Sequence, residues 1–559
     1  MIGTSLLEYI FIRACIIGLQ SVAPLSIIYF SAWVTSQVMD SPIPIEAPLP
    51  FKVWTSAEVV FYIFVNFIYR EKLQYEAVHP AAPSRNERKE LFQLCNSNIP
   101  DPEAYFKKWF LGATTDEIKR DNIKEFFLWA FFNRDGPPGE DDDELEEYVV
   151  ATEALLGRKI PDGRGSAVCL RLTIDGVSMA HRSILWYFCV GFVDFLTCLR
   201  LHAYGFAFRR TASPYFFMIF PIRPFTLFMA KRSPATRLTY WHRPHTSRTR
   251  RPVVFVHGIG IGLYPYVNFL RQLDSHLNAG RSADDQVGTI AIEIMPISFR
   301  ITHSAMTKDE MCDEIQAILK YHEFDKPVLV SHSYGTVVTT QLLKSPKLAN
   351  QIGPVVLIDP ISILLHLPDV AYNFTRRKPQ RANEHQLYYF ASMDMGVSHS
   401  LSRCFFWSEN VLWKQDIGER AITVSLAERD LIVNTKAVGN YLATCNEEKV
   451  ARKEESGCDT TNGNIPMEVI SENELGSTAL HLRSNAYTRC GISGLSSPKT
   501  VDRNSCNVHL DVGWQDQKWR GKGGDLIWFR TLDHAQVFDK VETRKPLVEA
   551  IHRYSVQSC

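Results

Sequence analysis

The sequence lacks an excess of charge of either sign. Its 559 residues include 61 lysines and arginines and 61 aspartates and glutamates, so the formal net charge is zero. A protein that binds the phosphate backbone normally carries a clear basic excess, so we expect no nucleic-acid partner. The hydrophobic share of 45% and the charged share of 22% are ordinary for globular proteins, which excludes a wholly disordered chain or a coiled-coil rod.

The sequence also lacks paired cysteines. None of its 12 cysteines stands in a CxxC pair, so a zinc site of the ribbon type is not expected. Several cysteines, such as Cys189 and Cys198, lie in apolar runs, where a thiol packs as a small hydrophobic side chain. We therefore predict a reduced, intracellular protein that needs no metal and no cofactor.

Charged residues are absent from one long stretch near the N-terminus. Residues 14–34 contain none, and about 20 predominantly apolar residues are enough to cross a bilayer as a helix. We therefore predict one N-terminal transmembrane helix in an intracellular membrane. Three further apolar runs, at residues 59–69, 183–199 and 214–230, are short or contain charges or prolines. A buried or interfacial helix is favoured for each of them.

Two motifs follow short apolar strands, and neither fits a nucleotide site. The first is HGIGIG at residues 257–262, which lacks both GxGxxG spacing and the GK[ST] of a phosphate loop. The second is SHSYG at residues 331–335, which joins a strand to a helical pattern. Such a turn lifts the central serine hydroxyl above the sheet, and it requires small residues two positions before and after. The pattern is G-x-S-x-G with Ser331 in place of the first glycine, which makes Ser333 the candidate nucleophile.

The HGxG loop followed by the S-x-S-x-G turn resembles the α/β-hydrolase superfamily, on its lipase and esterase side. The resemblance covers the chain from Arg251 to Cys445 and the C-terminal piece, and it extends to uncharacterised fungal membrane-associated members. It implies an α/β fold with a mostly parallel central sheet and helices on both faces. It also implies that the catalytic serine, acid and histidine follow one another in that order along the chain.

This order selects the acid and the histidine. Asp430 follows a predicted strand at 421–426 and matches the superfamily pattern, so it is the favoured acid. Asp359 follows a predicted strand at 353–358 and is the alternative acid, with a helix cap or loop contact as its other role. His534 follows the last predicted strand, where the superfamily places the general base.

The resemblance implies acyl transfer through a covalent serine intermediate. The histidine would accept the serine proton, the acid would orient the imidazole, and two backbone N–H groups would stabilise the oxyanion. His257 is expected to orient the oxyanion loop rather than to shuttle protons. The candidate residues are the catalytic Ser333, Asp430 and His534; Gly258 or Ile259 together with Tyr334 in the oxyanion hole; and Ser331, His332 and Gly335 in the nucleophile elbow.

Changes in composition divide the chain. The basic stretch 231–251 is predicted as a linker, and a polar tract after the core is predicted to be disordered. The predicted domains are a hydrophobic membrane-associated segment at 1–75, a helical region at 76–235, an α/β-hydrolase core at 236–445 with a cap insertion near 361–413, a disordered insertion at 446–510, and the last core strand with a C-terminal helix at 511–559.

The apolar pieces of the predicted cap suit an acyl chain better than a polar metabolite. The sequence therefore predicts a membrane-associated serine hydrolase that cleaves a hydrophobic, lipid-like carboxylic ester. Its expected partners are that ester and the bilayer, and no protein partner is indicated. An acyltransferase using the same three residues, or a catalytically silent binding protein with the same fold, are the alternatives.

Overall fold

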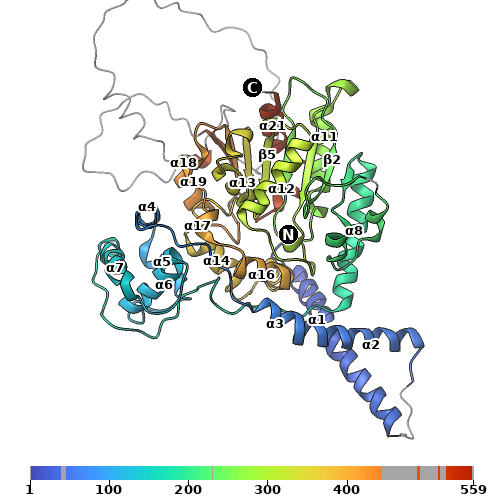
Figure 1. The fold of residues 1–559 in the computed structure, drawn as a ribbon, viewed down its shortest axis with the longest axis horizontal. Helices are drawn as coiled ribbons and strands as arrows, with labels where there is room; N and C mark the ends of the chain where they lie inside the picture. Colours follow the sequence, from blue (N-terminus) through green and yellow to red (C-terminus); the bar gives the residue numbers. More distant parts are fainter. Residues whose placement is uncertain are drawn as a thin grey trace, which may run out of the picture.

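A nine-stranded sheet lies at the centre of the molecule (Figure 1). The computed structural model describes residues 2–39, 46–229, 231–443, 488–491, 514–516 and 524–556. The strand order is β1-β2-β4-β3-β5-β6-β7-β9-β8, and β2 and β8 run antiparallel to the other strands. The strands are β1 (Ala207–Arg209), β2 (Thr239–Arg243), β3 (Val253–Val256), β4 (Thr289–Glu293), β5 (Val328–His332), β6 (Val355–Ile358), β7 (Ile422–Ala427), β8 (Thr488–Gly491) and β9 (Asp525–Phe529).

Helices cover both faces of this sheet, which is why its central strands are short, rich in β-branched residues and buried throughout. Side chains such as Phe255 pack against α11 and α21 on one face, and alternate side chains such as Val256 pack against α12 and α13 on the other. This arrangement is the α/β-hydrolase fold. The covering helices are α11 (Val267–Asn278), α12 (Lys308–Tyr321), α13 (Gly335–Lys344), α19 (Thr435–Ala443) and α21 (Val541–Val556).

One edge of the sheet was not predicted. The basic segment 231–251 is not simply a linker, because its residues Thr239–Arg243 form β2 and pair with β4. Tyr240 packs into the core on one face of the sheet and Trp241 into the core on the other. The prediction was wrong here because arginines, histidines and prolines surround a strand of only five residues.

Within the described residues, three helices are long and apolar enough to cross a membrane: α1 (Leu6–Val38), a continuous helix at Leu49–Leu73, and α8 (Ile184–Ala203). The second comprises α2 (Leu49–Ile63), the π-helical η1 (Phe64–Tyr69) and α3 (Arg70–Leu73). It is longer than the apolar run at 59–69 suggested, because the helix continues through the charged residues at both ends. The run at 214–230 forms only the short helices α9 (Ser213–Phe217) and α10 (Pro224–Leu227).

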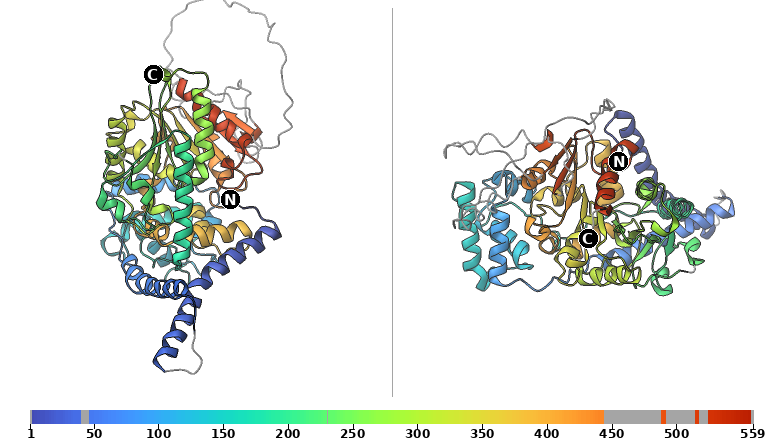
Figure 2. Two further views of the ribbon diagram at one scale, coloured as in Figure 1. Left: turned by 90° about the vertical axis from the view of Figure 1, so that its right-hand side faces the viewer. Right: turned by 90° about the horizontal axis from the view of Figure 1, so that it is seen from above.

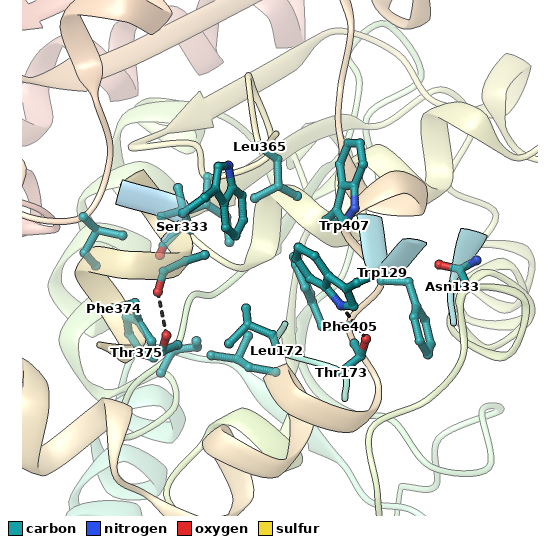
Figure 3. A pocket seen from close by; sticks show the side chains of 18 residues that line it. Trp129, Asn133, Leu172, Thr173, Ser333, Leu365, Phe374, Thr375, Phe405 and Trp407 are labelled. Carbon is teal, nitrogen blue, oxygen red and sulfur yellow. Dashed lines mark hydrogen bonds between the residues drawn. The ribbon is translucent and has the colours of Figure 1, made fainter. Parts of the chain in front are cut away.

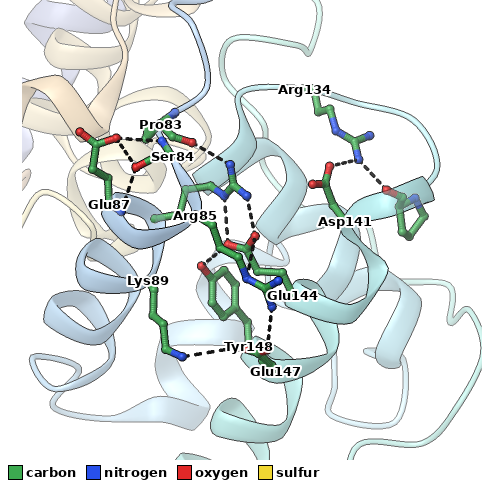
Figure 4. Close-up of polar contacts among 12 residues, drawn as sticks. Pro83, Ser84, Arg85, Glu87, Lys89, Arg134, Asp141, Glu144, Glu147 and Tyr148 are labelled. Carbon is green, nitrogen blue, oxygen red and sulfur yellow. Dashed lines mark hydrogen bonds and ion pairs between the residues drawn. The ribbon is translucent and has the colours of Figure 1, made fainter.

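Four helices before α8 form a compact bundle beside the core (Figures 1 and 2). Helix α4 is tied to α7 by Arg88, which pairs with Glu144. Figure 4 shows Glu144 beside Tyr148, whose hydroxyl donates a hydrogen bond to Glu144 Oε1 at 2.6 Å. The bundle contacts the core through Lys108, which pairs with Asp369 at 2.7 Å. The helices are α4 (Arg85–Asn96), α5 (Pro102–Trp109), α6 (Arg120–Phe132) and α7 (Asp142–Leu156).

A run of short helices lies between β6 and β7, at the position predicted for the cap. They are α14 (Pro368–Thr375), α15 (Ala382–Gln386), the π-helical η7 (Leu387–Ser392), α16 (Met395–Arg403), α17 (Trp407–Asn410) and α18 (Lys414–Ile417). The insertion predicted at 446–510 lies outside the described residues, apart from β8, whose backbone pairs with the edge strand β9.

Candidate active site

Ser333 lies in a sharp turn between β5 and α13, with a positive φ of 50°. The turn is tight, since a Cβ atom on Gly335 would lie 2.4 Å from the carbonyl oxygen of Val256. Ser331 is tolerated at the first small position because its buried hydroxyl accepts a hydrogen bond from Thr339 Oγ1 at 2.8 Å. A strained serine at such a turn has the geometry of a nucleophile elbow.

The loop after β9 brings His534 to this serine. Its Nε2 lies 2.8 Å from Ser333 Oγ, and its Nδ1 lies 2.7 Å from Asp430 Oδ2. The three side chains therefore form one hydrogen-bonded chain, although more than one hundred residues separate His534 from either partner. This is the spatial arrangement of a serine nucleophile, a general base and an orienting carboxylate.

Asp430 is fixed by its own loop. Its Oδ1 accepts hydrogen bonds from the N–H groups of Ile432 and Val433 at 2.8 and 2.9 Å, which leaves Oδ2 for the imidazole. Asp533, which sequence reasoning did not single out, joins this loop to the histidine loop. Its Oδ1 accepts from the N–H groups of Leu431 and His534, and its Oδ2 accepts from Asn383 in the cap.

Asp359, the alternative acid, is bonded to the backbone of the histidine loop. Its Oδ2 accepts a hydrogen bond from the N–H of Ala535 at 2.8 Å and lies 3.8 Å from His332 Nε2. It makes no hydrogen bond to the imidazole of His534, whose Nδ1 is bonded to Asp430. In this geometry Asp359 holds the loop that carries the histidine.

The oxyanion loop is held by two buried rings. His257 Nε2 accepts from the N–H of Ile294 at 2.9 Å, so its Nδ1 donates to the carbonyl oxygen of Gly258. The N–H of Gly258 donates to the hydroxyl of Tyr266 at 3.2 Å, and that hydroxyl donates to His332 Nδ1. The N–H of Gly258 is therefore occupied by Tyr266, although the sequence predicted it as one possible oxyanion donor.

Two backbone donors remain for an oxyanion. Within the described part of the chain, the N–H groups of Ile259 and Tyr334 donate to no protein acceptor. Tyr334 directly precedes α13, so the positive end of the helix dipole also lies at this point. Ile259 lines the same pocket as Ser333. The geometry therefore favours Ile259 over Gly258 as the partner of Tyr334.

Charge at the site favours the protonated imidazole. Burial alone would lower the pKa of His534, but the charge and hydrogen bond of Asp430, with further contributions from Asp359 and Asp533, raise it to about 9. Burial has the opposite outcome for His257, whose pKa falls to about 4. It also holds the pKa of His332 well below its ordinary value, aided by the positive charge of His534. His534 is thus the histidine poised to carry a proton.

An apolar pocket opens beside Ser333 (Figure 3). The cap supplies Leu365, Phe374, Phe405 and Trp407 to its wall. Polar groups are few, and the hydroxyl of Thr173 is occupied by a hydrogen bond from Trp129 Nε1 at 2.9 Å. The remaining lining is mostly aliphatic or aromatic: Trp109, Asn133, Leu172, Ile259, Ile361, Val370, Ala371, Thr375, Leu401, Phe406 and Ile432.

Part of this pocket was not foreseen from the sequence. Trp109 on α5, Trp129 on α6 and Leu172 line it, although all three lie in the helical region at 76–235. That region showed only amphipathic helix patterns, which do not reveal what the helices pack against. No signal in the sequence links these residues to Ser333. The structure thus brings the helical region and the cap together around one cavity.

Comparisons with known proteins find a likeness at the level of structure alone. No family model and no curated protein matches the sequence. A bacterial membrane phospholipase A shares 10% identity, with 46% of this chain and 81% of that chain covered at a TM-score of 0.28. A carboxylesterase from Bacillus subtilis shares 12%, with 36% and 74% covered at 0.25. A meta-cleavage product hydrolase from Pseudomonas fluorescens shares 17%, with 37% and 84% covered at 0.26. The fold assignment itself comes from the sheet order and the turn at Ser333.

Proposed function

We propose that this protein is a membrane-associated serine hydrolase that cleaves a hydrophobic carboxylic ester through an acyl-serine intermediate. The observation that carries the proposal is the hydrogen-bonded chain from Asp430 through His534 to Ser333, at the edge of an apolar pocket. The resemblance to fungal membrane-associated hydrolases stays a prediction.

In the proposed mechanism, Ser333 Oγ attacks the ester carbonyl carbon while His534 Nε2 accepts its proton. The oxyanion that forms is stabilised by the N–H groups of Ile259 and Tyr334, and losing one such donor typically costs about 10²–10³-fold in rate. The imidazolium then gives its proton to the departing alcohol, which leaves an acyl-Ser333 enzyme. Water attacks this acyl group with His534 again as base, and the free acid leaves.

The substrate class follows from the pocket. An ester whose acyl part is apolar would lose water from that part on entering, and apolar burial gains roughly 25 cal/mol per Å². The pocket offers aromatic and aliphatic walls and no charged side chain. An acylglycerol, a sterol ester or another lipid ester fits this lining, whereas a charged metabolite would lose its hydration without a partner.

Membrane association is proposed from two exposed apolar helices, α1 and the continuous helix Leu49–Leu73, which meet the length and hydropathy needed to enter a bilayer. The seven cysteines whose side chains are described are free thiols, which suits a reducing compartment. The intracellular membrane and a single N-terminal crossing stay predictions from the sequence.

Fluorophosphonate labelling of detergent-extracted protein tests the proposed chemistry. We expect wild type and the exposed-serine control Ser282→Ala to be labelled, and Ser333→Ala to be unlabelled. Hydrolysis of a lipid ester should fall at least about 10³-fold in Ser333→Ala, because the attacking oxygen is gone. Equal labelling of Ser333→Ala and wild type would show that the reactive serine is another one. A folded wild type without label or activity would favour a silent scaffold.

A further inference from the structure

Helix α8 is long and apolar enough to cross a membrane, but it is bound to the hydrolase core by buried charges. Asp194, near its middle, pairs with Arg300 at 2.5 Å and with Arg223 at 3.2 Å. Arg223 also pairs with Glu293 on β4 at 2.9 Å. All four side chains are buried. A crossing by α8 would pull Asp194 away from both arginines, so α8 stays on the body of the protein.

The outer face of α8 is nevertheless apolar and exposed. Phe188, Phe192, Phe195 and Leu199 recur at helical spacing and form one stripe along it. The inner face is buried, with Cys198 and Leu201 packed in the core. An exposed stripe of three phenylalanines and a leucine is unusual on a water-facing surface.

Two neighbouring elements continue this apolar surface. The segment that contains α9 and α10 lies against α8, with the ring of Phe225 5.6 Å from that of Phe195. It exposes Phe217, Met218, Ile222 and Phe228, the last at 90%. Its position is fixed by Arg223, whose buried side chain belongs to the ion cluster. The exposed apolar side chains are therefore held out by a rigid support.

The helices α1 and α2 emerge next to this surface. Phe61 on α2 packs against Tyr187 on α8 and against Phe220, and buried Glu58 accepts a hydrogen bond from the N–H of Ile184. The second half of α1 packs back on α2, where Tyr29 meets Phe51. Figures 1 and 2 show α2 and α8 on the same side of the molecule, and α1 and α2 project from that side.

Positive charge accompanies the apolar surface. Between Asp194 and Asp274 the chain has twelve arginines and lysines and no acidic residue. Of these, Lys231 and Arg232 are exposed just after Phe228, and Arg232 lies beside Arg210 in a β-bridge. Cationic side chains next to an apolar surface can reach lipid phosphates while the apolar groups enter the acyl region.

We propose that α8 and the α9–α10 segment form a docking surface for one leaflet of a lipid bilayer, with α8 lying in the interface and the α1–α2 hairpin inserted beside it. This inference rests on the proposed membrane association and not on the proposed chemistry. The sequence predicts a buried or interfacial helix for residues 183–199, and the docking surface makes α8 the interfacial one, although its length and hydropathy also meet the requirements for a span.

Depth-dependent fluorescence quenching tests this docking surface. A fluorophore is attached to Phe192→Cys in full-length protein reconstituted in phosphatidylcholine–phosphatidylserine vesicles. The fluorescence of parent protein treated with the same fluorophore is subtracted. A helix in the interface lies about 5–10 Å deep, so lipids with a shallow nitroxide should quench about twofold more strongly than lipids with a deep one. The matched control is Val541→Cys on α21, because the exposed fractions are 54% for Phe192 and 57% for Val541. It should show no lipid quenching.

Stronger quenching of the fluorophore at position 192 by the deep nitroxide than by the shallow one would mean that α8 crosses the bilayer. Equal quenching of the fluorophores at positions 192 and 541 would mean that α8 does not dock. Either result overturns the proposal. Flotation of the unlabelled parent protein with vesicles tests membrane association itself. A parent that floats would limit the failure to the docking surface, whereas a parent that does not float would contradict the proposed membrane association as well. Fluorophosphonate labelling of Ser333 does not depend on any of these outcomes.

Discussion

The imidazole of His534 lies between the hydroxyl of Ser333 and the carboxylate of Asp430, so its protonation state decides whether Ser333 can be activated in the proposed mechanism. Because the pKa of His534 is raised to about 9, the ring is mainly a cation at neutral pH and cannot accept the serine proton. We therefore expect kcat/KM for a water-soluble ester to rise with pH from neutrality toward about 9. A profile of kcat/KM between pH 5 and 10 measures this rising part of the curve, the alkaline-going limb. A flat profile would contradict the role of His534 as the base.

The same profile separates the two candidate acids. Asp430→Asn removes the charge that raises the pKa of His534, so the limb should move to lower pH. The rate should also fall, by about 10⁴-fold if the imidazole loses its correct tautomer. Asp359→Asn should retain far more activity, since this carboxylate binds the N–H of Ala535. The reverse ranking would make Asp359 the acid.

Single residues could be predicted from the sequence where their neighbours along the chain form a recognisable pattern. Ser333 could be predicted because a turn between strand and helix demands small neighbours, and His534 and Asp430 because each follows a strand end in the implied order. Tyr266 could not be predicted, because its role is a hydrogen bond to Gly258 and His332 that only the folded loop creates. Asp533 was missed for the same reason, although it adjoins His534 in the sequence.

At the scale of elements, the buried ion cluster decides how α8 behaves. Asp194→Ala leaves Arg300 buried without its carboxylate, and breaking such a pair typically costs about 3–5 kcal/mol of folding free energy. Asp313→Ala breaks an exposed pair with Lys347 and should cost less than about 1 kcal/mol. Thermal unfolding in detergent micelles compares the two. Similar shifts in Tm would mean that the cluster does not hold α8 in place.

Elements were predicted well where hydrophobic patterns were long and poorly where contacts were distant. The strands β6 and β7 lie close to the predicted ranges 353–358 and 421–426, because each is a continuous apolar run that is buried on both faces. β2 was mistaken for part of a linker, since its five residues carry charge and aromatic rings. The pocket walls from α5 and α6 were missed, because periodicity indicates a buried helical face but not its partner.

At the scale of the whole molecule, both ends of the α1–α2 hairpin are attached to the same body. Ile12 and Ile16 near the start of α1 pack with Tyr389 in the cap region, and Leu73 at the end of α3 packs near Met395. A chain that enters a bilayer and returns in this way keeps its N-terminus on the side of the hydrolase core.

We therefore expect epitope tags before Met1 and after Cys559 to be accessible from the same side of sealed membrane vesicles. Antibody binding before and after permeabilisation measures this. Tags on opposite sides would support the single crossing predicted from the sequence, and they would require α1 to leave the cap. An antibody against a lumenal resident protein controls for leakage.

Asp533 links the cap to the loops that carry Asp430 and His534. One of its oxygens is bonded to Asn383 in the cap, and the other to the N–H groups of Leu431 and His534. Because one carboxylate makes all three hydrogen bonds, a displacement of Asn383 would reach the loops of both Asp430 and His534 through Asp533.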